Sequence, residues 1–291
     1  MWIILSLLSA FFAAATDPLA KRLLKDNDPY LIGWAQIFLS ALFLFPYCHY
    51  CGSAQYLPGS FKTILAAIPF EIAALVLYYK SLALTDISLS VPFLALTPVF
   101  SVMTGFFILG ENVTPGGIAG VLLIMAGAYT INLKHVINGV TKPVSEIFRN
   151  RGSLYMVIVA LILSLTTALT KKAMLSSDPE SFPFIYNFSV SAAMAPIVMV
   201  RLSTPGRRTL KISLSSTVFF LAMGLSLALA CVFYYKAVSI ANIAYVVSVK
   251  RLSLILSVFY GWLFFRERDI HIHLGSTVCM VAGVILIFIC N

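Results

Sequence analysis

Ten long apolar stretches, separated by short groups of charged or turn-forming residues, dominate the sequence. A hydrocarbon core about 30 Å thick needs about 20 apolar residues per helical crossing, and each stretch is long enough. Strands of a membrane barrel would be about ten residues long and strictly alternating, which these stretches are not. The sequence therefore predicts an all-α integral membrane protein with ten transmembrane helices. The stretches cover residues 2–20, 30–50, 62–82, 87–109, 115–133, 153–174, 183–203, 213–235, 239–264 and 272–290.

Composition excludes most other classes of protein. Charged residues make up 11% of the 291 residues, against roughly 25% in a soluble domain. The net charge of +9 comes from cations scattered through short loops, which is typical of topology signals and not of a nucleic-acid-binding face. Nucleophile–base sets and phosphate-binding loops are absent from the sequence, and Cys48, His49 and Cys51 are too few ligands for a closed zinc site. We expect no enzyme activity, cofactor, metal or nucleic-acid partner, and the oligomeric state stays open.

An internal repeat organises the chain. KRLLKDNDP (Lys21–Pro29) matches KKAMLSSDP (Lys171–Pro179) at an offset of 150 positions. YYKSLALTDI (Tyr78–Ile87) matches YYKAVSIANI (Tyr234–Ile243) at an offset of 156 positions. A duplication of five helices, an odd number, makes the second copy enter the membrane upside down. The predicted domains are a first five-helix repeat over 1–134, a connecting loop over 135–152 and a second repeat over 153–291.

Inverted repeats predict transport. They place a solute site near the bilayer midplane between the halves, where rocking gives alternating access. Lysine and arginine gather in the loops that follow odd-numbered helices, so the positive-inside rule puts these loops in the cytoplasm and both termini outside. We expect a multi-pass protein of the bacterial inner (plasma) membrane.

Two cations lie at the centre of the ninth apolar stretch. Lys250 and Arg251 would each cost about 2.5–3.5 kcal/mol there on insertion scales, so they should face a cavity or partners. The first repeat has Leu94 and Ala95 at the equivalent positions, so the fold does not require charge. Arginine binds carboxylate or phosphate through two parallel hydrogen bonds and lysine adds a point charge. The pair is therefore our candidate site for an anionic group.

Hydroxyl groups accompany this pair. Ser253 and Ser257 follow Lys250 at helical spacing, and their repeat equivalents are Thr97 and Ser101. Tyr235, in the YYK motif, is a further candidate for contact with the solute.

Two acidic residues raise the question of coupling. Glu71 lies at the middle of the third stretch and Asp17 near the end of the first. Either carboxylate could carry a proton, and Glu71 could equally neutralise Lys250 or Arg251 as a structural ion pair.

The chain resembles the EamA-type drug/metabolite transporter superfamily. The matching stretches are PVFSVMTGFFILGENVTPGGIAGVLLIMAGAYTI from Pro98 and SLILSVFYGWLFFRERDIHIHLGSTVCMVAGVILI from Ser253. The second stretch has Arg266 before its glutamate, where the family usually has glycine. The resemblance implies ten helices around a central cavity. The Lys-Arg pair in VKRLSLILSVF is similar to the ninth-helix pair of the plastid triose-phosphate translocator branch, although Val246 and Val247 replace the Gly-Asn of that branch.

These patterns together predict a secondary transporter that moves a small organic metabolite bearing a carboxylate or phosphate through the lipid bilayer. A proton or a counter-substrate is the candidate coupling partner. Two alternatives stay open. One is an exporter of amino acids or drugs in which Glu71 is locked to Lys250 or Arg251, and the other is a non-transporting, lipid-handling membrane subunit.

Overall fold

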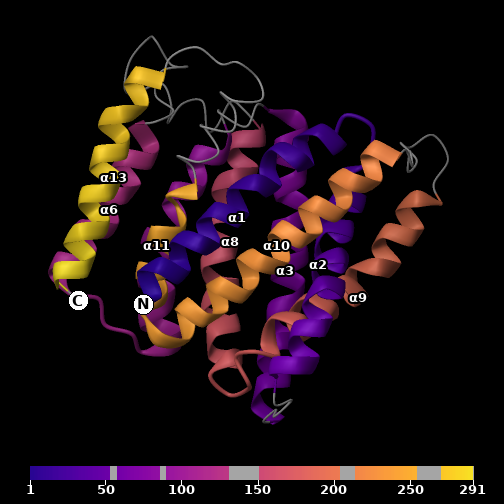
Figure 1. Cartoon of the computed structure of the whole chain (residues 1–291), viewed down its shortest axis with the longest axis horizontal. Helices are drawn as coiled ribbons and strands as arrows, with labels where there is room; N and C mark the ends of the chain where they lie inside the picture. The colour runs from indigo at the N-terminus through magenta and orange to yellow at the C-terminus, as the bar shows by residue number, and fades with distance from the viewer. Residues whose placement is uncertain (53–57, 86–89, 131–150, 204–213, 254–269, 291) are drawn as a thin grey trace.

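The computed structural model describes residues 1–52, 58–85, 90–130, 151–203, 214–253 and 270–290, and every regular element in this part of the chain is helical. The prediction of an all-α protein is confirmed there. Figure 1 shows a bundle of long helices with both chain termini at the same end. The elements are α1 (Trp2–Leu23), α2 (Pro29–Cys51), α3 (Pro58–Leu84), η1 (Val91–Leu96), α5 (Thr97–Thr104), η2 (Gly105–Leu109), α6 (Pro115–Thr130), α8 (Arg151–Met174), α9 (Phe182–Leu202), α10 (Leu214–Ile240), α11 (Ile243–Lys250) and α13 (Ile270–Cys290).

Six of the described helices are long and apolar enough to cross a membrane: α1, α2, α8, α9 and most of α3 and α10. Shorter apolar helical stretches cover Phe93–Leu109, Pro115–Ala128 and Val278–Cys290. The outer faces of the bundle are apolar, with Phe107 79%, Met199 68% and Ile289 72% exposed. Contact of these side chains with lipid tails costs no free energy, whereas their exposure to water would be unfavourable.

The fourth apolar stretch does not form one regular helix. It is divided into the 3₁₀-helix η1, the α-helix α5 and the π-helix η2. Pro92 and Pro98 each stand at the first turn of their segment, where the missing N–H costs least. Gly110 then ends η2 with a left-handed φ of 68°, which glycine adopts without strain.

The ninth stretch also differs from the expected single helix. Helix α10 extends to Ile240, α11 begins at Ile243, and Lys250 is the last residue of α11. The placement of Lys250 and Arg251 at the centre of one helix is therefore wrong for the described part. Arg251, the C-cap, keeps right-handed helical dihedrals, so neighbouring side chains still point about 100° apart. Both side chains nevertheless line one cavity.

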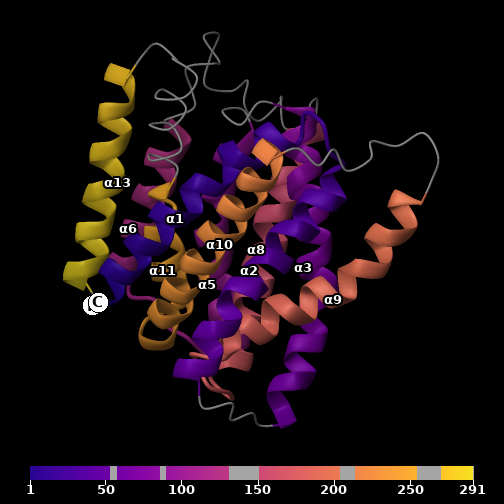
Figure 2. The ribbon, with the colours of Figure 1, turned by 45° about the vertical axis from the view of Figure 1, so that its right-hand side comes forward.

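The most extensive helix contacts join the two halves of the chain. Helix α1 packs on α10, α3 on α8, α2 on α9 and α6 on α13, as Figure 2 shows from a second direction. Hydrogen bonds from side chains to carbonyls cross three of these contacts, which suits helices packed in lipid. They are Ser9 Oγ to Ala230 O at 2.9 Å, Ser81 Oγ to Gly152 O at 2.7 Å and Trp34 Nε1 to Ser191 O at 3.0 Å.

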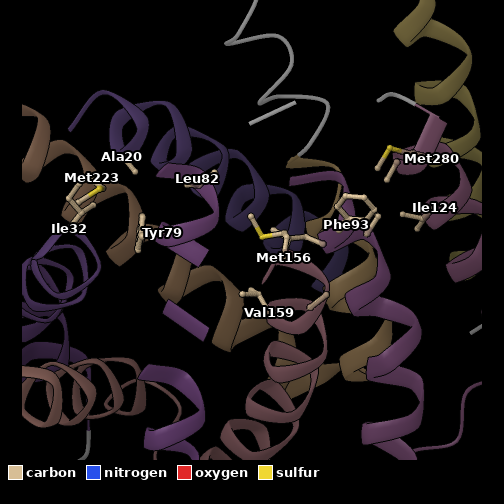
Figure 3. Packing of buried hydrophobic residues seen from close by; sticks show 14 of the residues in the cluster. Ala20, Ile32, Tyr79, Leu82, Phe93, Ile124, Met156, Val159, Met223 and Met280 are labelled. Carbon is tan, nitrogen blue, oxygen red and sulfur yellow. The ribbon is translucent and has the colours of Figure 1, made fainter. Parts of the chain in front are cut away.

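A hydrophobic core runs through the middle of the bundle. Met156 and Val159 of α8 lie between Tyr79 and Leu82 of α3 on one side and Phe93 of η1 on the other (Figure 3). All five side chains are buried. This packing holds α3, η1 and α8 around the polar side chains described next.

Candidate functional site

A cavity of about 210 Å³ lies inside the bundle, lined by residues of α1, α2, α3, η1, α8, α10 and α11. Pockets for drug-sized ligands run roughly 300–1,000 Å³, so this one suits a small solute. Its polar lining comprises Thr16, Asp17, Gln36, Glu71, Tyr78, Tyr79, Lys250, Arg251 and Ser253.

Lys250 and Arg251 both line this cavity, and neither forms an ion pair with a carboxylate of the described residues. The Lys250 ammonium lies 4.5 Å from the centroid of the Tyr234 ring, a cation–π contact. Within the described part of the chain, Nε of Arg251 is buried and has no hydrogen-bond partner. A buried charge-bearing donor without a partner costs free energy, which a bound anion would recover.

Asp17 stands on α1 beside the arginine. The Tyr78 hydroxyl donates a hydrogen bond to Oδ1 of Asp17, and Arg251 acts electrostatically on both groups. Pro18 follows Asp17 inside α1 and has no N–H to donate to the preceding turn. The carboxylate, the phenol and the guanidinium therefore form one polar wall of the cavity.

Glu71, on α3, has a different partner. Oε2 of Glu71 accepts a hydrogen bond of 3.1 Å from the Tyr186 hydroxyl of α9. Lys250 acts on Glu71 electrostatically, but among the described residues no ion pair joins Glu71 to Lys250 or Arg251. The tyrosine, and not a cation, holds this carboxylate in place.

The other predicted contact residues lie elsewhere. Thr97 and Ser101 are fully buried on α5, and neither hydroxyl has a hydrogen-bond partner among the described residues. Tyr235 packs edge-on against the Phe182 ring, with 5.1 Å between centroids, in a separate hydrophobic cluster. Ser257 lies outside the described residues. Of the four predicted hydroxyl-bearing residues that the structure describes, Ser253 lines the cavity.

Gln36 and Tyr79 belong to the cavity but were not among the predicted contacts. The Tyr79 hydroxyl donates a hydrogen bond to Oε1 of Gln36, and both residues line the cavity. Gln36 is the one amide side chain in the apolar stretch over 30–50. An isolated amide in an apolar stretch indicates a polar site in the fold, although the residue carries no charge.

Comparison with known proteins gives the following matches. The family described as the EamA-like transporter family matches residues 1–133 and 150–289, which is nearly the whole chain. A solved crystal structure of another protein is similar over 100% of this chain and 99% of its own, with a TM-score of 0.78 at 14% sequence identity. At that identity the likeness concerns the fold alone. No curated protein matches the sequence. The two matched segments, the apolar helices and the internal polar cavity agree, and the chain, a multi-pass integral membrane protein, belongs to the EamA-like transporter family.

Proposed function

We propose that this protein is a secondary transporter for a small organic metabolite bearing a carboxylate or phosphate, and that Lys250 and Arg251 bind the anionic group. The observation that carries the proposal is the buried Nε of Arg251, without a hydrogen-bond partner among the described residues, in a cavity that Lys250 also lines. Membership of the EamA-like family supports transport of a small molecule, and the bacterial inner membrane is its proposed location.

The chemistry of the two cations favours an anion. Arginine offers a planar fork of donors to a carboxylate or phosphate, and lysine adds a compact charge. In a low-dielectric cavity such contacts are stronger than in water. Ser253 supplies a hydroxyl beside them. Thr97 and Ser101 stay candidates because, within the described residues, their buried hydroxyls have no partner.

Charge balance favours a coupled mechanism. The cavity lining contains two carboxylates, Asp17 and Glu71, and two cations, Lys250 and Arg251, so its formal charges cancel. An incoming anion would leave a net negative charge in a medium that solvates charge poorly. A proton on Glu71 or Asp17 would offset that charge, and exchange for a second anion would avoid it.

Alternating access between two inverted five-helix halves, 1–134 and 153–291, is the proposed mechanism. The pattern of packing supports it. Helix α1 of the first half is equivalent to α8 of the second, and α3 is equivalent to α10, so the α1–α10 contact and the α8–α3 contact are equivalent. The α6–α13 contact joins two equivalent helices. A helix that ends inside the bundle, as α11 does at Lys250, is typical of solute sites in transporters with inverted repeats.

A thermal-shift measurement on purified protein tests the site. Inorganic phosphate and a panel of phosphorylated and carboxylated metabolites are added to the wild type, because a ligand at 100 times its Kd adds about 2.7 kcal/mol of stability. Arg251→Ala should remove a charge-assisted contact worth about 1.5–3 kcal/mol and weaken binding roughly 10- to 100-fold.

The matched control is Lys236→Ala. Lys236 is 41% exposed, is paired with Glu180 at 3.7 Å and does not line the described cavity. This variant should keep the wild-type shift. An anion that stabilises Arg251→Ala and the wild type equally would show that the site assignment is wrong.

A further inference from the structure

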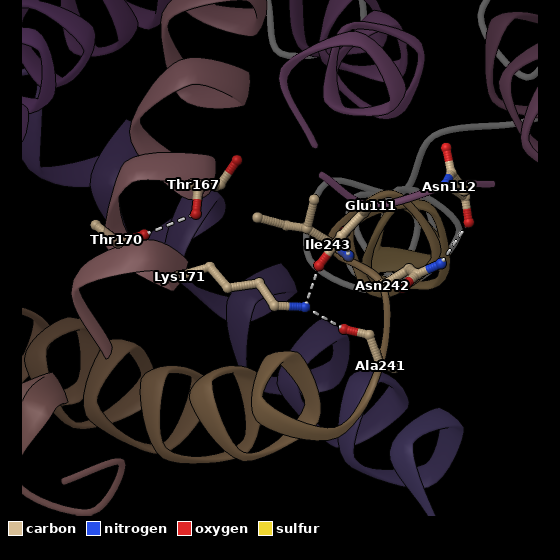
Figure 4. Close-up of polar contacts among 8 residues, drawn as sticks. All are labelled: Glu111, Asn112, Thr167, Thr170, Lys171, Ala241, Asn242 and Ile243. Carbon is tan, nitrogen blue, oxygen red and sulfur yellow. Dashed lines mark hydrogen bonds and ion pairs between the residues drawn. The ribbon is translucent and has the colours of Figure 1, made fainter. Parts of the chain in front are cut away.

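A second polar cluster lies away from the cavity, at the end of the bundle that holds both termini (Figure 4). Lys171, in the last turn of α8, places its Nζ 2.5 Å from Oε1 of Glu111, and the two side chains are only 7% and 12% exposed. The same Nζ donates a hydrogen bond of 2.6 Å to the carbonyl of Ala241. Lys171 therefore holds both the loop before α6 and the turn between α10 and α11.

Glu111 also caps a helix. Its second oxygen, Oε2, accepts a hydrogen bond of 2.8 Å from the backbone N–H of Ile243, the first residue of α11. A carboxylate at this position accepts a hydrogen bond from an otherwise free N–H and interacts favourably with the positive N-terminal end of the helix dipole. The left-handed Gly110 precedes Glu111 and turns the chain back at the end of η2. One carboxylate thus joins α8 to the start of the helix that carries Lys250.

Neighbouring contacts extend this junction. Asn242 Nδ2 donates a hydrogen bond of 3.2 Å to the carbonyl of Asn112. Thr114 N donates to the Tyr245 hydroxyl at 3.3 Å, and Thr114 Oγ1 donates to the carbonyl of Cys290 at 3.0 Å. The loop between η2 and α6, which belongs to the first half, is therefore bound to α8, α11 and α13 of the second half.

A repeat-equivalent arrangement occurs at the opposite end of the bundle. Lys21, the counterpart of Lys171 at an offset of 150 positions, donates to the carbonyls of Leu82 at 2.6 Å and Thr85 at 2.7 Å. Thr85 is the counterpart of Ala241 at the offset of 156 positions. Each half thus sends a lysine from the end of its first helix to the same carbonyl position. This correspondence indicates that the contact belongs to the repeated fold and is not incidental.

We propose that the Lys171–Glu111 pair is a latch that holds the terminus-bearing end of the bundle closed and must break each time this end opens. The inference rests on the proposed alternating-access function. Closure keeps the two charges paired and shielded, and opening would admit water to solvate them separately. The strength of the pair therefore sets how often this end is open, independently of the solute.

Spin-label distances test the latch without any solute. Labels on Asn112→Cys and Leu175→Cys, in a background with the five native cysteines replaced by alanine, report the separation of the η2–α6 loop from the end of α8. Both positions are exposed, and Asn112 joins the cluster through its backbone carbonyl, which a cysteine retains. We expect a single short distance in the wild type. Glu111→Gln or Lys171→Met should add a longer distance and change the ratio of the two populations by at least about tenfold, because each leaves a buried charge without its partner.

The control is Glu180→Gln, which breaks the more exposed Lys236–Glu180 pair and should keep the wild-type distance. If either single variant does not fold, the double variant Lys171→Met/Glu111→Gln, which buries no unpaired charge, makes the same comparison. Wild-type distances in the folded latch variants would overturn the latch.

Solute flux through the wild type is measured separately. If the latch variants keep the wild-type distances and the wild type transports a solute, only the latch is rejected. If the latch variants shift the distances and the wild type transports none of the tested solutes, only the transport function is rejected.

Discussion

Asp17 and Glu71 share one cavity with Lys250 and Arg251, yet each carboxylate accepts a hydrogen bond from a tyrosine. Tyr78 donates to Asp17 and Tyr186 donates to Glu71. A hydroxyl donor positions a carboxylate without neutralising its charge, so the two cations stay available for a ligand. This division of roles is what the proposed anion site requires of four charged residues in the interior of a membrane protein.

Replacing Glu71 with glutamine should separate a structural role from a coupling role. The amide oxygen can still accept the Tyr186 hydrogen bond, and among the described residues no ion pair of Glu71 is lost. We expect a folded protein whose thermal midpoint changes by only a few degrees, as for the loss of about 1 kcal/mol. Solute accumulation driven by a pH gradient should be lost, while solute exchange at equal pH persists. Aggregation of the variant in detergent, with Tyr186→Phe well folded, would instead indicate a structural carboxylate.

At the residue scale, the sequence predicted the charged part of the cavity and little of its neutral part. Asp17, Glu71, Lys250 and Arg251 were conspicuous because charge inside an apolar stretch is rare and costly. The Lys171–Glu111 pair was not predictable, because each residue lies near the end of its own stretch, where charge is ordinary. The two residues become partners only when α8 and the η2–α6 loop pack together in the fold.

At the scale of elements, hydrophobic length predicted helices well where the chain is regular. The limits of α2, α8 and α9 lie within about two residues of the expected stretches, the usual uncertainty of helix ends. The breaks at η1, η2 and the end of α11 were missed, because a change of helix type inside an apolar stretch leaves mean hydropathy unchanged. One of these breaks follows directly after Lys250 and Arg251, which line the cavity.

The contact between α6 and α13 depends on small residues. A Cβ added at Gly120 would meet the carbonyl of Gly283 and the side chain of Ile287 at less than van der Waals distance. Gly120→Leu should therefore separate the helices and cost about 1–3 kcal/mol of stability, measured as a lower thermal midpoint in detergent. Ala126→Leu, on an exposed face of the same helix, adds apolar volume without this clash and should behave as the wild type. Equal midpoints for the two variants would show that the close approach of α6 and α13 is not required.

At the scale of the whole molecule, the repeat connects sequence, packing and function. The two offsets seen in the sequence correspond to partners in space, since Lys21 reaches Thr85 as Lys171 reaches Ala241. The described cavity is lined by helices of both halves. The proposed latch at one end and the repeat-equivalent lysine at the other would suit the proposed alternating access, in which the two ends open in turn.

Flux through reconstituted vesicles tests the central claim most directly. Wild-type protein, Arg251→Ala and the control Lys236→Ala are reconstituted at equal density, and uptake of radiolabelled phosphate and of the metabolites that stabilise the protein is measured. Wild type and Lys236→Ala should transport at least one anionic solute at similar rates, and Arg251→Ala should lose at least about 80% of the flux at a solute concentration near the wild-type Kd. Equal flux of that solute through Arg251→Ala and the wild type would contradict the account, as would a wild type that moves only uncharged or cationic solutes.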